Sequence, residues 1–438
     1  MKIYQYPSQA AEKKLAVIEN RSIGFRKKDV TAVARIIEAV KKNGDDALLS
    51  YTRQFDSPKI KKSALKVSAK EMAAAQKQVD RSFVKALNRA ARQVKHFHCQ
   101  QRPSSWVNVE RPGTLLGQIV NPVDAAGIYV PGGKEGKTPL VSTVLMCAIP
   151  AGIAGVKRIC MATPPMRNGK VNPHLLVAAK KAGVHEIYKI GSAWAVAALA
   201  YGTRTILKTN VIVGPGNIYV TLAKKLVSGE VGIDMIAGPS EILIIADQTA
   251  NPDYIAADLL SQAEHDPLSS AVLVTTSQRV AAAVSTALDS QLKALDRRET
   301  AAASLDRFGA IMKVPDLAIA IAFANRIAPE HLEVQIKNPL SHIGSIRNAG
   351  AVFLGDYTPE PVGDYMAGPN HVLPTAGTAR YASALSVDHF MKKSSVIQYS
   401  RQAFQKEAKD IIRLAQVEGL GAHANAVRIR LKPVSSKE

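Results

Sequence analysis

Hydrophobic positions along the chain follow two different periods. In residues 29–55, "DVTAVARIIEAVKKNGDDALLSYTRQF", apolar residues recur every three to four positions, which is typical of an amphipathic helix with a break at Gly44. The chain is expected to be helix-rich up to about residue 100. After "RPSSW" the pattern of residue types changes, and short β-branched runs alternate with alanine-rich helical stretches.

The alternation of strands and helices after residue 102 is typical of βαβ units. One series runs from "AAGIYVPGG" through "KRICMATPP" and "NVIVGPGN" to "IYVTLAKKLV". A second begins near "SEILIIAD" (Ser240 to Asp247) and continues through "AVLVTT" and "AVFLGDY". Because strands alternating with helices form parallel sheets, the pattern predicts an α/β protein with two doubly wound domains. The end of the chain is expected to be mostly helical, with an extended stretch at "AVRIRLKPV" (residues 426–434).

The composition agrees with a soluble α/β protein. The 438 residues are too many for one ordinary core, and 47% of them are hydrophobic, 21% charged and 5% aromatic. The formal net charge is +21, and residues 1–102 hold 23 Lys and Arg against 9 Asp and Glu. These basic residues are interleaved with helix-period apolar ones, which favours solvated helix faces. A nucleic-acid-binding surface would also need stacking aromatics or a known motif, and neither is present.

Cysteines and apolar runs indicate the compartment. Cys99, Cys147 and Cys160 form no CxxC pair and no even disulfide framework, so a reducing environment is expected. The chain has no run of 18 apolar residues, and its start, "MKIYQYPSQAAEKK", lacks an apolar signal core. We therefore expect a cytoplasmic protein without membrane contact.

Two glycine-rich turns follow predicted strands, "YVPGGK" (Tyr129 to Lys134) and "VGPGN" (Val213 to Asn217). Ligands of open α/β sheets bind at the carboxyl ends of strands, where backbone N–H groups and helix N-termini favour phosphate. Neither turn matches GxGxxG, so ordinary βα turns are an equally good interpretation.

The stretch "SQAEHDP" (Ser261 to Pro267) ends a predicted helix with polar residues. Gln262 and His265 stand at i and i+3, so on a helix they share a face and could bind one ion. For the stretch taken alone, a solvated helix terminus is the favoured interpretation. Two residues cannot hold zinc. Further candidate ligands, Asp364 and His423, stand in polar segments far along the chain, and spacing alone does not join them.

"APEHLE" places Glu330 and His331 side by side between a helix ending near Ile327 and a strand starting near Leu332. In a loop both side chains can reach one pocket, where His accepts protons near neutral pH and a carboxylate can activate water. A polar connection without a catalytic role is the alternative.

Taken together, these stretches resemble the histidinol dehydrogenase family. The resemblance runs from about Asp29 to Arg430 and is carried by seven motifs in order: "GIYVPGGK", "VGPGNIYVT", "IDMIAGPSE", "LSQAEHDP", "APEHLE", "GDYMAGPNHVLPT" and "LSVDHFMKK". It implies oxidation of L-histidinol through histidinaldehyde to L-histidine with two NAD⁺ and one zinc ion per subunit, in a homodimer with shared active sites.

The resemblance also implies the fold and the roles of individual residues. The fold would comprise two incomplete Rossmann-like domains, a discontinuous first one over 29–120 and 240–384 and a second one over 121–239 on the NAD side. A helical segment over 1–28 would precede them, and a tail over 385–438 would be exchanged in the dimer. Zinc would be held by Gln262, His265 and Asp364, with His423 from the partner's tail. His331 would take the alcohol proton and Glu330 would activate water.

Substrate and cofactor contacts follow from the same resemblance. The zinc ligands and His331 would also contact substrate, joined by Ser240 and by Glu418 from the partner, and His371 would line the pocket. Tyr129 and Asn217 match the family's NAD contacts, whereas Trp194 stands where a glutamine is usual, and an indole cannot replace the amide's donor and acceptor pair. Gly419 and Gly421 also depart from the pattern, and each would cost about 0.5–1 kcal/mol inside a helix.

Two alternatives remain open at this stage. A paralogue of the same architecture could oxidise another small polar alcohol, although a carboxylate at Glu418 favours a basic substrate. A basic nucleic-acid-binding protein on the same fold would have no use for the complete set of ligands and catalytic residues.

Overall fold

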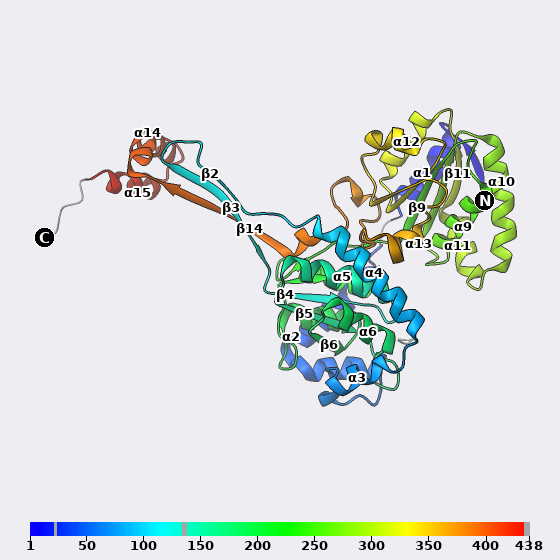
Figure 1. The fold of residues 1–438 in the computed structure, drawn as a ribbon, viewed down its shortest axis with the longest axis horizontal. Coiled ribbons are helices and arrows are strands. Elements are labelled where there is room, and N and C mark those ends of the chain that lie inside the picture. Colours follow the sequence, from blue (N-terminus) through cyan, green and yellow to red (C-terminus); the bar gives the residue numbers. More distant parts are fainter. Residues whose placement is uncertain (22–23, 134–137, 433–438) are drawn as a thin grey trace. The chain divides into compact units, whose positions relative to one another are not determined.

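The computed structural model describes residues 1–21, 24–133 and 138–432, which form two compact units. Unit 1 comprises residues 1–102 and 123–390 and holds two parallel sheets (Figure 1). Unit 2 comprises residues 103–122 and the chain from Met391 onward. Within the described residues, no helix combines the length and apolar character needed to cross a membrane.

The first sheet of unit 1 has six parallel strands in the order β1-β11-β10-β9-β12-β13. Their bounds are β1 Ile3–Gln5, β9 Glu241–Ala246, β10 Ser270–Thr275, β11 Gly309–Lys313, β12 His331–Gln335 and β13 Ala351–Leu354. The central strands are buried along their whole length, which explains their continuous apolar runs.

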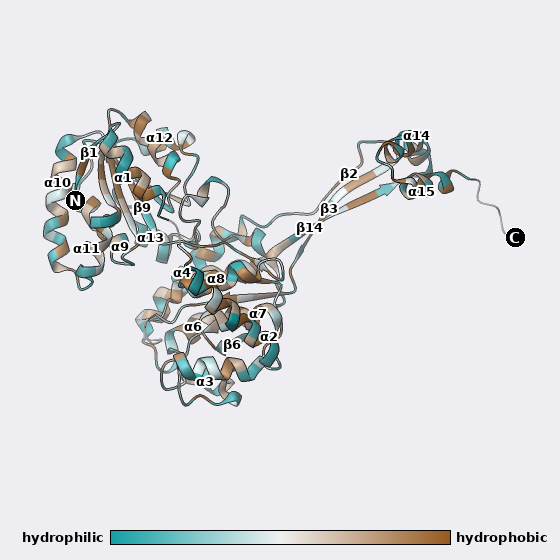
Figure 2. Cartoon of the chain, turned by 180° about the vertical axis from the view of Figure 1, so that it is seen from behind, coloured by the Kyte–Doolittle hydropathy of each residue, from teal (hydrophilic) through white to brown (hydrophobic). Residues whose placement is uncertain are grey.

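Alternate residues of these strands pack on opposite faces, so the sheet is covered on both sides. Ile242 and Ile244 pack with the helices α9, α10 and α11, whereas Leu243 and Ile245 pack with α1 and α12. The helices are α1 Gln9–Glu19, α9 Pro252–Ala263, α10 Gln278–Gln291, α11 Arg298–Phe308 and α12 Leu317–Ile327. Figure 2 shows hydrophobic colour along the inner strands and hydrophilic colour on the outer helices. The predicted doubly wound arrangement is confirmed.

The second sheet has five parallel strands in the order β6-β5-β4-β7-β8. Their bounds are β4 Ala125–Tyr129, β5 Arg158–Thr163, β6 Glu186–Lys189, β7 Val211–Val213 and β8 Gly232–Ile233. The helices of the βαβ units are α5 Val141–Ala154, α6 Pro173–Ala182, α7 Ser192–Tyr201 and α8 Ile218–Val227. Both predicted βαβ series therefore form parallel sheets, and the expected α/β class is confirmed.

The amino-terminal helices join the second sheet rather than the first. Helix α2 (Lys27–Phe55), kinked at Gly44 with φ +51°, packs against α7 and α8. Helices α3 (Ala69–Gln76) and α4 (Arg81–Cys99) pack against α6 and α5. This differs from the expected grouping of residues 29–120 with 240–384, because the apolar face of α2 matches the alanine-rich surface of α7. Residues 1–28 differ too, since β1 forms the edge of the first sheet.

Unit 2 contains an antiparallel sheet that was not predicted, in the order β14-β3-β2. Its elements are β2 Trp106–Asn108, β3 Thr114–Pro122, β14 Met391–Tyr399, α14 Arg401–Val417 and α15 Gly421–Leu431. The expected extended stretch over 426–434 is wrong as far as Leu431, because α15 continues to that residue. Pro433 and Val434 lie outside the described residues.

Candidate functional site

Glu330 and His331 lie at the amino-terminal end of β12, beside the start of β9. Helix α12 ends at Ile327, and the left-handed φ of +53° at the following Ala328 turns the chain into the strand. Gly350 lies against this turn, because a Cβ there would stand 2.6 Å from the carbonyl oxygen of Glu330. The predicted position between helix and strand is confirmed, and both side chains are buried.

The backbone of Glu241 at the start of β9 orients both residues. Its N–H donates to Oε2 of Glu330 at 3.0 Å, and its carbonyl oxygen lies 3.1 Å from Nδ1 of His331. The side-chain oxygen Oε1 of Gln262 also lies 3.1 Å from this Nδ1. Because two acceptors face Nδ1, the ring proton belongs on that nitrogen, and Nε2 is left free to accept a proton.

Burial changes the acid–base properties of this group. Loss of solvent, opposed by His331 and assisted by the nearby Glu241 and Glu360 carboxyls, raises the pKa of Glu330 to about 7. A carboxyl with a pKa near neutrality can exchange protons at physiological pH, as a general base requires.

A cluster of possible metal ligands adjoins His331. Among the described residues, ligand atoms of His331, Glu360 and Asp364 lie within 4.8 Å of one another. Glu360 begins the short helix α13 (Glu360–Val362), and Asp364 follows in the π-helical turn η5 (Gly363–Ala367). Nε2 of His331 lies 3.8 Å from Oε1 of Glu360. Burial, together with the nearby Asp364 carboxylate, raises the pKa of Glu360 to about 8.

The predicted ligands are brought together in part. Gln262, at the end of α9, is fully buried against His331, and its Nε2 has no hydrogen-bond partner among the described residues. His265 is exposed, its Nδ1 lies 2.8 Å from the carbonyl oxygen of Ser261, and its charge lowers the pKa of Glu360. Asp364 stands in the cluster described above. Glu360 was not predicted, although it lies four residues before Asp364, a spacing that shares a helix face.

Further predicted residues lie around this cluster or in unit 2. Ser240 precedes β9, and His371 lines a cavity of about 290 Å³ together with His331 and Asp364. Glu418 caps α14, and His423 lies in the first turn of α15 in unit 2, where both are exposed. Gly419 has φ +73° in the turn between the two helices, so the helix penalty expected for it does not apply.

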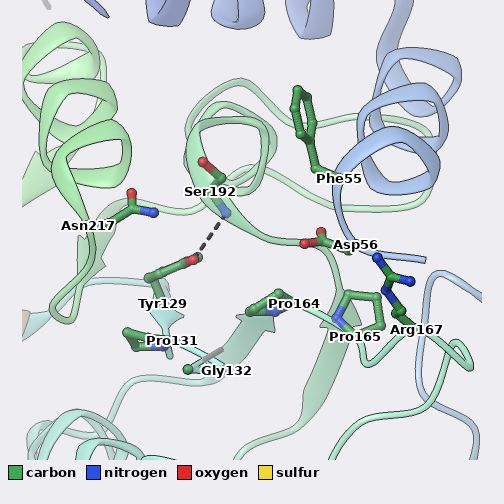
Figure 3. A pocket seen from close by; sticks show the side chains of 11 residues that line it. Phe55, Asp56, Tyr129, Pro131, Gly132, Pro164, Pro165, Arg167, Ser192 and Asn217 are labelled. Carbon is green, nitrogen blue, oxygen red and sulfur yellow. Dashed lines mark hydrogen bonds between the residues drawn. The ribbon is translucent and has the colours of Figure 1, made fainter. Parts of the chain in front are cut away.

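A second cavity, of about 430 Å³, lies at the carboxyl ends of the strands of the second sheet (Figure 3). Tyr129 ends β4, and its hydroxyl accepts a hydrogen bond of 3.0 Å from the N–H of Ser192 at the start of α7. Asn217 lines the same cavity and caps α8 through the N–H groups of Tyr219 and Val220. Tyr129 and Asn217 are thus brought together as expected of a nucleotide pocket. Lys134 lies outside the described residues.

The turn "VGPGN" is held from both sides. Gly214 has φ +112°, and a Cβ there would stand 2.2 Å from the carbonyl oxygen of Tyr129. Its N–H donates to Oδ2 of Asp234 at 2.8 Å, and its carbonyl oxygen accepts from Nζ of Lys224 at 3.0 Å. Lys224 and Asp234 form a buried ion pair. This pair fixes the loop that leads to Asn217.

Trp194 is a core residue and does not line the cavity. Its indole stacks on Phe55 with ring centroids 5.5 Å apart and on Tyr51 with centroids 5.7 Å apart. Its Nε1 has no hydrogen-bond partner among the described residues. Trp194 therefore packs against the aromatic side chains Tyr51 and Phe55 at the carboxyl-terminal end of α2.

Comparisons with known proteins agree with these features. The family model described as histidinol dehydrogenase matches residues 20–431. A histidinol dehydrogenase of Desulfotalea psychrophila is 56% identical over 92% of this chain and 93% of its own length. One of Clostridium acetobutylicum is 48% identical over 99% of both chains. The crystal structure of histidinol dehydrogenase from Elizabethkingia anophelis superposes with a TM-score of 0.92 at 38% identity, covering 98% of each chain.

Proposed function

Since this chain belongs to the histidinol dehydrogenase family, we propose that it oxidises L-histidinol through L-histidinaldehyde to L-histidine and reduces two NAD⁺. The observation that carries the proposal is the buried pair of Glu330 and His331, with Nδ1 of the imidazole held by two oxygen acceptors. The paralogue alternative has no support among the relatives described above, which all carry the same name.

The two residues divide the acid–base work. In the first oxidation Nε2 of His331 accepts the hydroxyl proton as hydride passes to NAD⁺. In the second, Glu330 removes a proton from water, which adds to the aldehyde carbon. The hydrate then loses hydride to a second NAD⁺. Glu330 suits this role because its raised pKa makes its carboxylate a stronger base than an exposed one.

The polar cluster fits a divalent cation. The buried oxygen Oε2 of Glu360 has no hydrogen-bond partner among the described residues, and ligand atoms of His331, Glu360 and Asp364 lie within 4.8 Å of one another. We propose that Gln262, His265 and Asp364 would hold zinc, with His423 of a second subunit. When bound, zinc supplies a Lewis acid for the imidazole and amine nitrogens of the substrate. The charge of the zinc ion and that of the one carboxylate among its four ligands would sum to about +1. A site with this charge can accept further neutral ligands.

Unit 2 supports a shared site in a homodimer. Large hydrophobic side chains are exposed on its sheet and helices: Trp106, Val107, Val109, Ile119, Ile397, Leu414, Val417 and Ile429. Figure 2 shows this hydrophobic colour among the hydrophilic segments of α14, α15 and the strands. Apolar exposure of this kind marks a protein interface. We propose that a second subunit covers it, and that Glu418 and His423 complete the partner's site, where Ser240 also contacts substrate.

Substrate analogues test the proposed activity. L-phenylalaninol keeps the amino alcohol but lacks the imidazole, and 4-(3-hydroxypropyl)imidazole keeps the ring and the chain length but lacks the amine. Because a site built for polar groups rejects analogues that leave those groups unpaired, kcat/KM for each should fall by at least about 100-fold relative to L-histidinol. Equal or better turnover of either analogue would favour the paralogue.

Mixed dimers test the shared site. Glu330→Gln and His423→Ala variants are each expected to be inactive in the complete reaction. After subunit exchange, a heterodimer has one complete site if His423 crosses the interface, so about a quarter of wild-type activity should return. As a control, Glu330→Gln mixed with Asp364→Ala should stay inactive, because both residues come from one subunit. Inactive mixtures in both cases would show that His423 does not act in the partner.

A further inference from the structure

Asp56 occupies one end of the cavity that contains Tyr129 and Asn217 and is not among the predicted site residues. It follows the last residue of α2, Phe55, and both line the cavity. Figure 3 shows Asn217 and Tyr129 at one side, with Asp56 and Arg167 at the other. The hydroxyl of Ser57 donates to the carbonyl oxygen of Arg167 at 3.1 Å, so the end of α2 is tied to the loop after β5.

One oxygen of the Asp56 carboxylate lacks a hydrogen-bond partner in the part of the chain that the structure describes. This oxygen, Oδ2, is buried, and burial raises the pKa of the carboxyl to about 7. Gly191 lies directly against it, because a Cβ there would stand 3.1 Å from Oδ2 and 2.9 Å from Pro164. A carboxylate held in this way is an acceptor that lacks a donor.

Phe55 supplies an aromatic surface beside that acceptor. Its side chain is 60% exposed, yet its ring is stacked on the buried indole of Trp194, with an interplanar angle of 23°. An exposed ring that is held from behind is a stacking surface for a purine base. The ribose attached to such a base carries two hydroxyl donors, which match the missing partners of Asp56.

We propose that Phe55 and Asp56 form the adenosine subsite of this cavity, and that Asp56 selects NAD over NADP by accepting hydrogen bonds from the ribose hydroxyls. NADP carries a 2′-phosphate in place of one donor. The 2′-phosphate and the Asp56 carboxylate would repel each other, because both are negatively charged and no hydrogen-bond donor separates them. This repulsion disfavours binding of NADP. The inference rests on the proposed function, since it concerns the cofactor of that reaction.

The test compares both cofactors with Asp56→Asn and Asp56→Ser. The control is Glu38→Gln, which removes an exposed carboxylate elsewhere on α2. With L-histidinol as substrate, Asp56→Asn should raise KM for NAD about tenfold or more, since a hydrogen bond to a charged group is lost, with kcat within twofold. KM for NADP should fall, most in Asp56→Ser, which frees space for the 2′-phosphate beside Arg167. Glu38→Gln should match wild type.

Two results would overturn the inference: an unchanged ratio of kcat/KM for NAD to that for NADP, or a fall in kcat with unchanged KM. Direct titration with NADH and NADPH, followed by fluorescence without histidinol, separates this inference from the proposed function. A wild-type protein that binds NADH in an Asp56-dependent way but oxidises no histidinol would refute the function alone. Thermal melting confirms folding, and Asp56→Asn should melt no lower than wild type, because Oδ2 of Asp56 makes no hydrogen bond among the described residues that the substitution could remove.

Discussion

Replacing Glu330 by Gln should make the protein more stable at alkaline pH. In the wild type, burial raises the pKa of Glu330 from its ordinary value of 4.5 to about 7. Between these values the unfolded chain has released the proton and the folded chain still holds it. The free energy of unfolding therefore falls as pH rises through this window, by about 1.4 kcal/mol per pH unit. Glutamine carries no titrating proton and avoids this loss.

The expected gain follows from the size of the shift. A rise of about 2.5 pKa units corresponds to about 3 kcal/mol, which should separate the variant from wild type at pH 8 and vanish near pH 4.5. The amide oxygen of the introduced glutamine can still accept from the Glu241 N–H. With an unfolding entropy of roughly 2.1 cal/mol/K per residue, the melting temperature should rise by about 3–4 °C if the whole chain unfolds together.

Differential scanning calorimetry of the metal-free protein at pH 5, 6, 7 and 8 measures this difference. Glu38→Gln serves as the control, because its carboxylate is exposed and its removal should leave the pH dependence of Tm unchanged. A Tm difference between Glu330→Gln and wild type that stays constant from pH 5 to pH 8 would refute the reasoning. So would a variant less stable than wild type at pH 8.

Three further experiments test neighbouring parts of the account. Glu330→Gln should slow oxidation of supplied histidinaldehyde more than the first NADH burst from histidinol; equal slowing would contradict the division of roles. Gly214→Ala should weaken NADH binding at least about tenfold in a fluorescence titration, because its Cβ would meet the Tyr129 carbonyl. Lys224→Met should lower stability to urea by about 3–5 kcal/mol by leaving Asp234 buried without a counterion, and adding Asp234→Asn should restore most of it.

Local elements of the fold were predictable because they depend on short-range periodicity. The helix with its break at Gly44, the end of α9 and the strand after it all stand where the apolar spacing placed them. The partner of an amphipathic helix depends on long-range packing, which spacing does not encode. For this reason residues 29–120 were expected with residues 240–384, whereas α2 packs against α7 and α8. The strands of unit 2 were missed because β3 and β14 pair across more than 250 residues.

The candidate site was predictable where motifs identify it, and less so where single side chains act. Glu330, His331 and Gln262 belong to quoted motifs and meet in the structure. Asp56 and Glu360 are isolated carboxyls, and only burial distinguishes them from exposed ones. The rule that ligands meet the carboxyl ends of strands points to Tyr129, which ends β4 in the second sheet. It does not point to His331, which begins β12.

The most direct test of the central claim is the number of NADH molecules formed per L-histidinol consumed, measured in one sample with zinc and in a matched sample treated with a chelator. The account predicts two NADH for each histidinol with zinc, L-histidine as the product, and loss of turnover in the chelated sample that added zinc restores. One NADH per histidinol, or full turnover in the chelated sample, would contradict it.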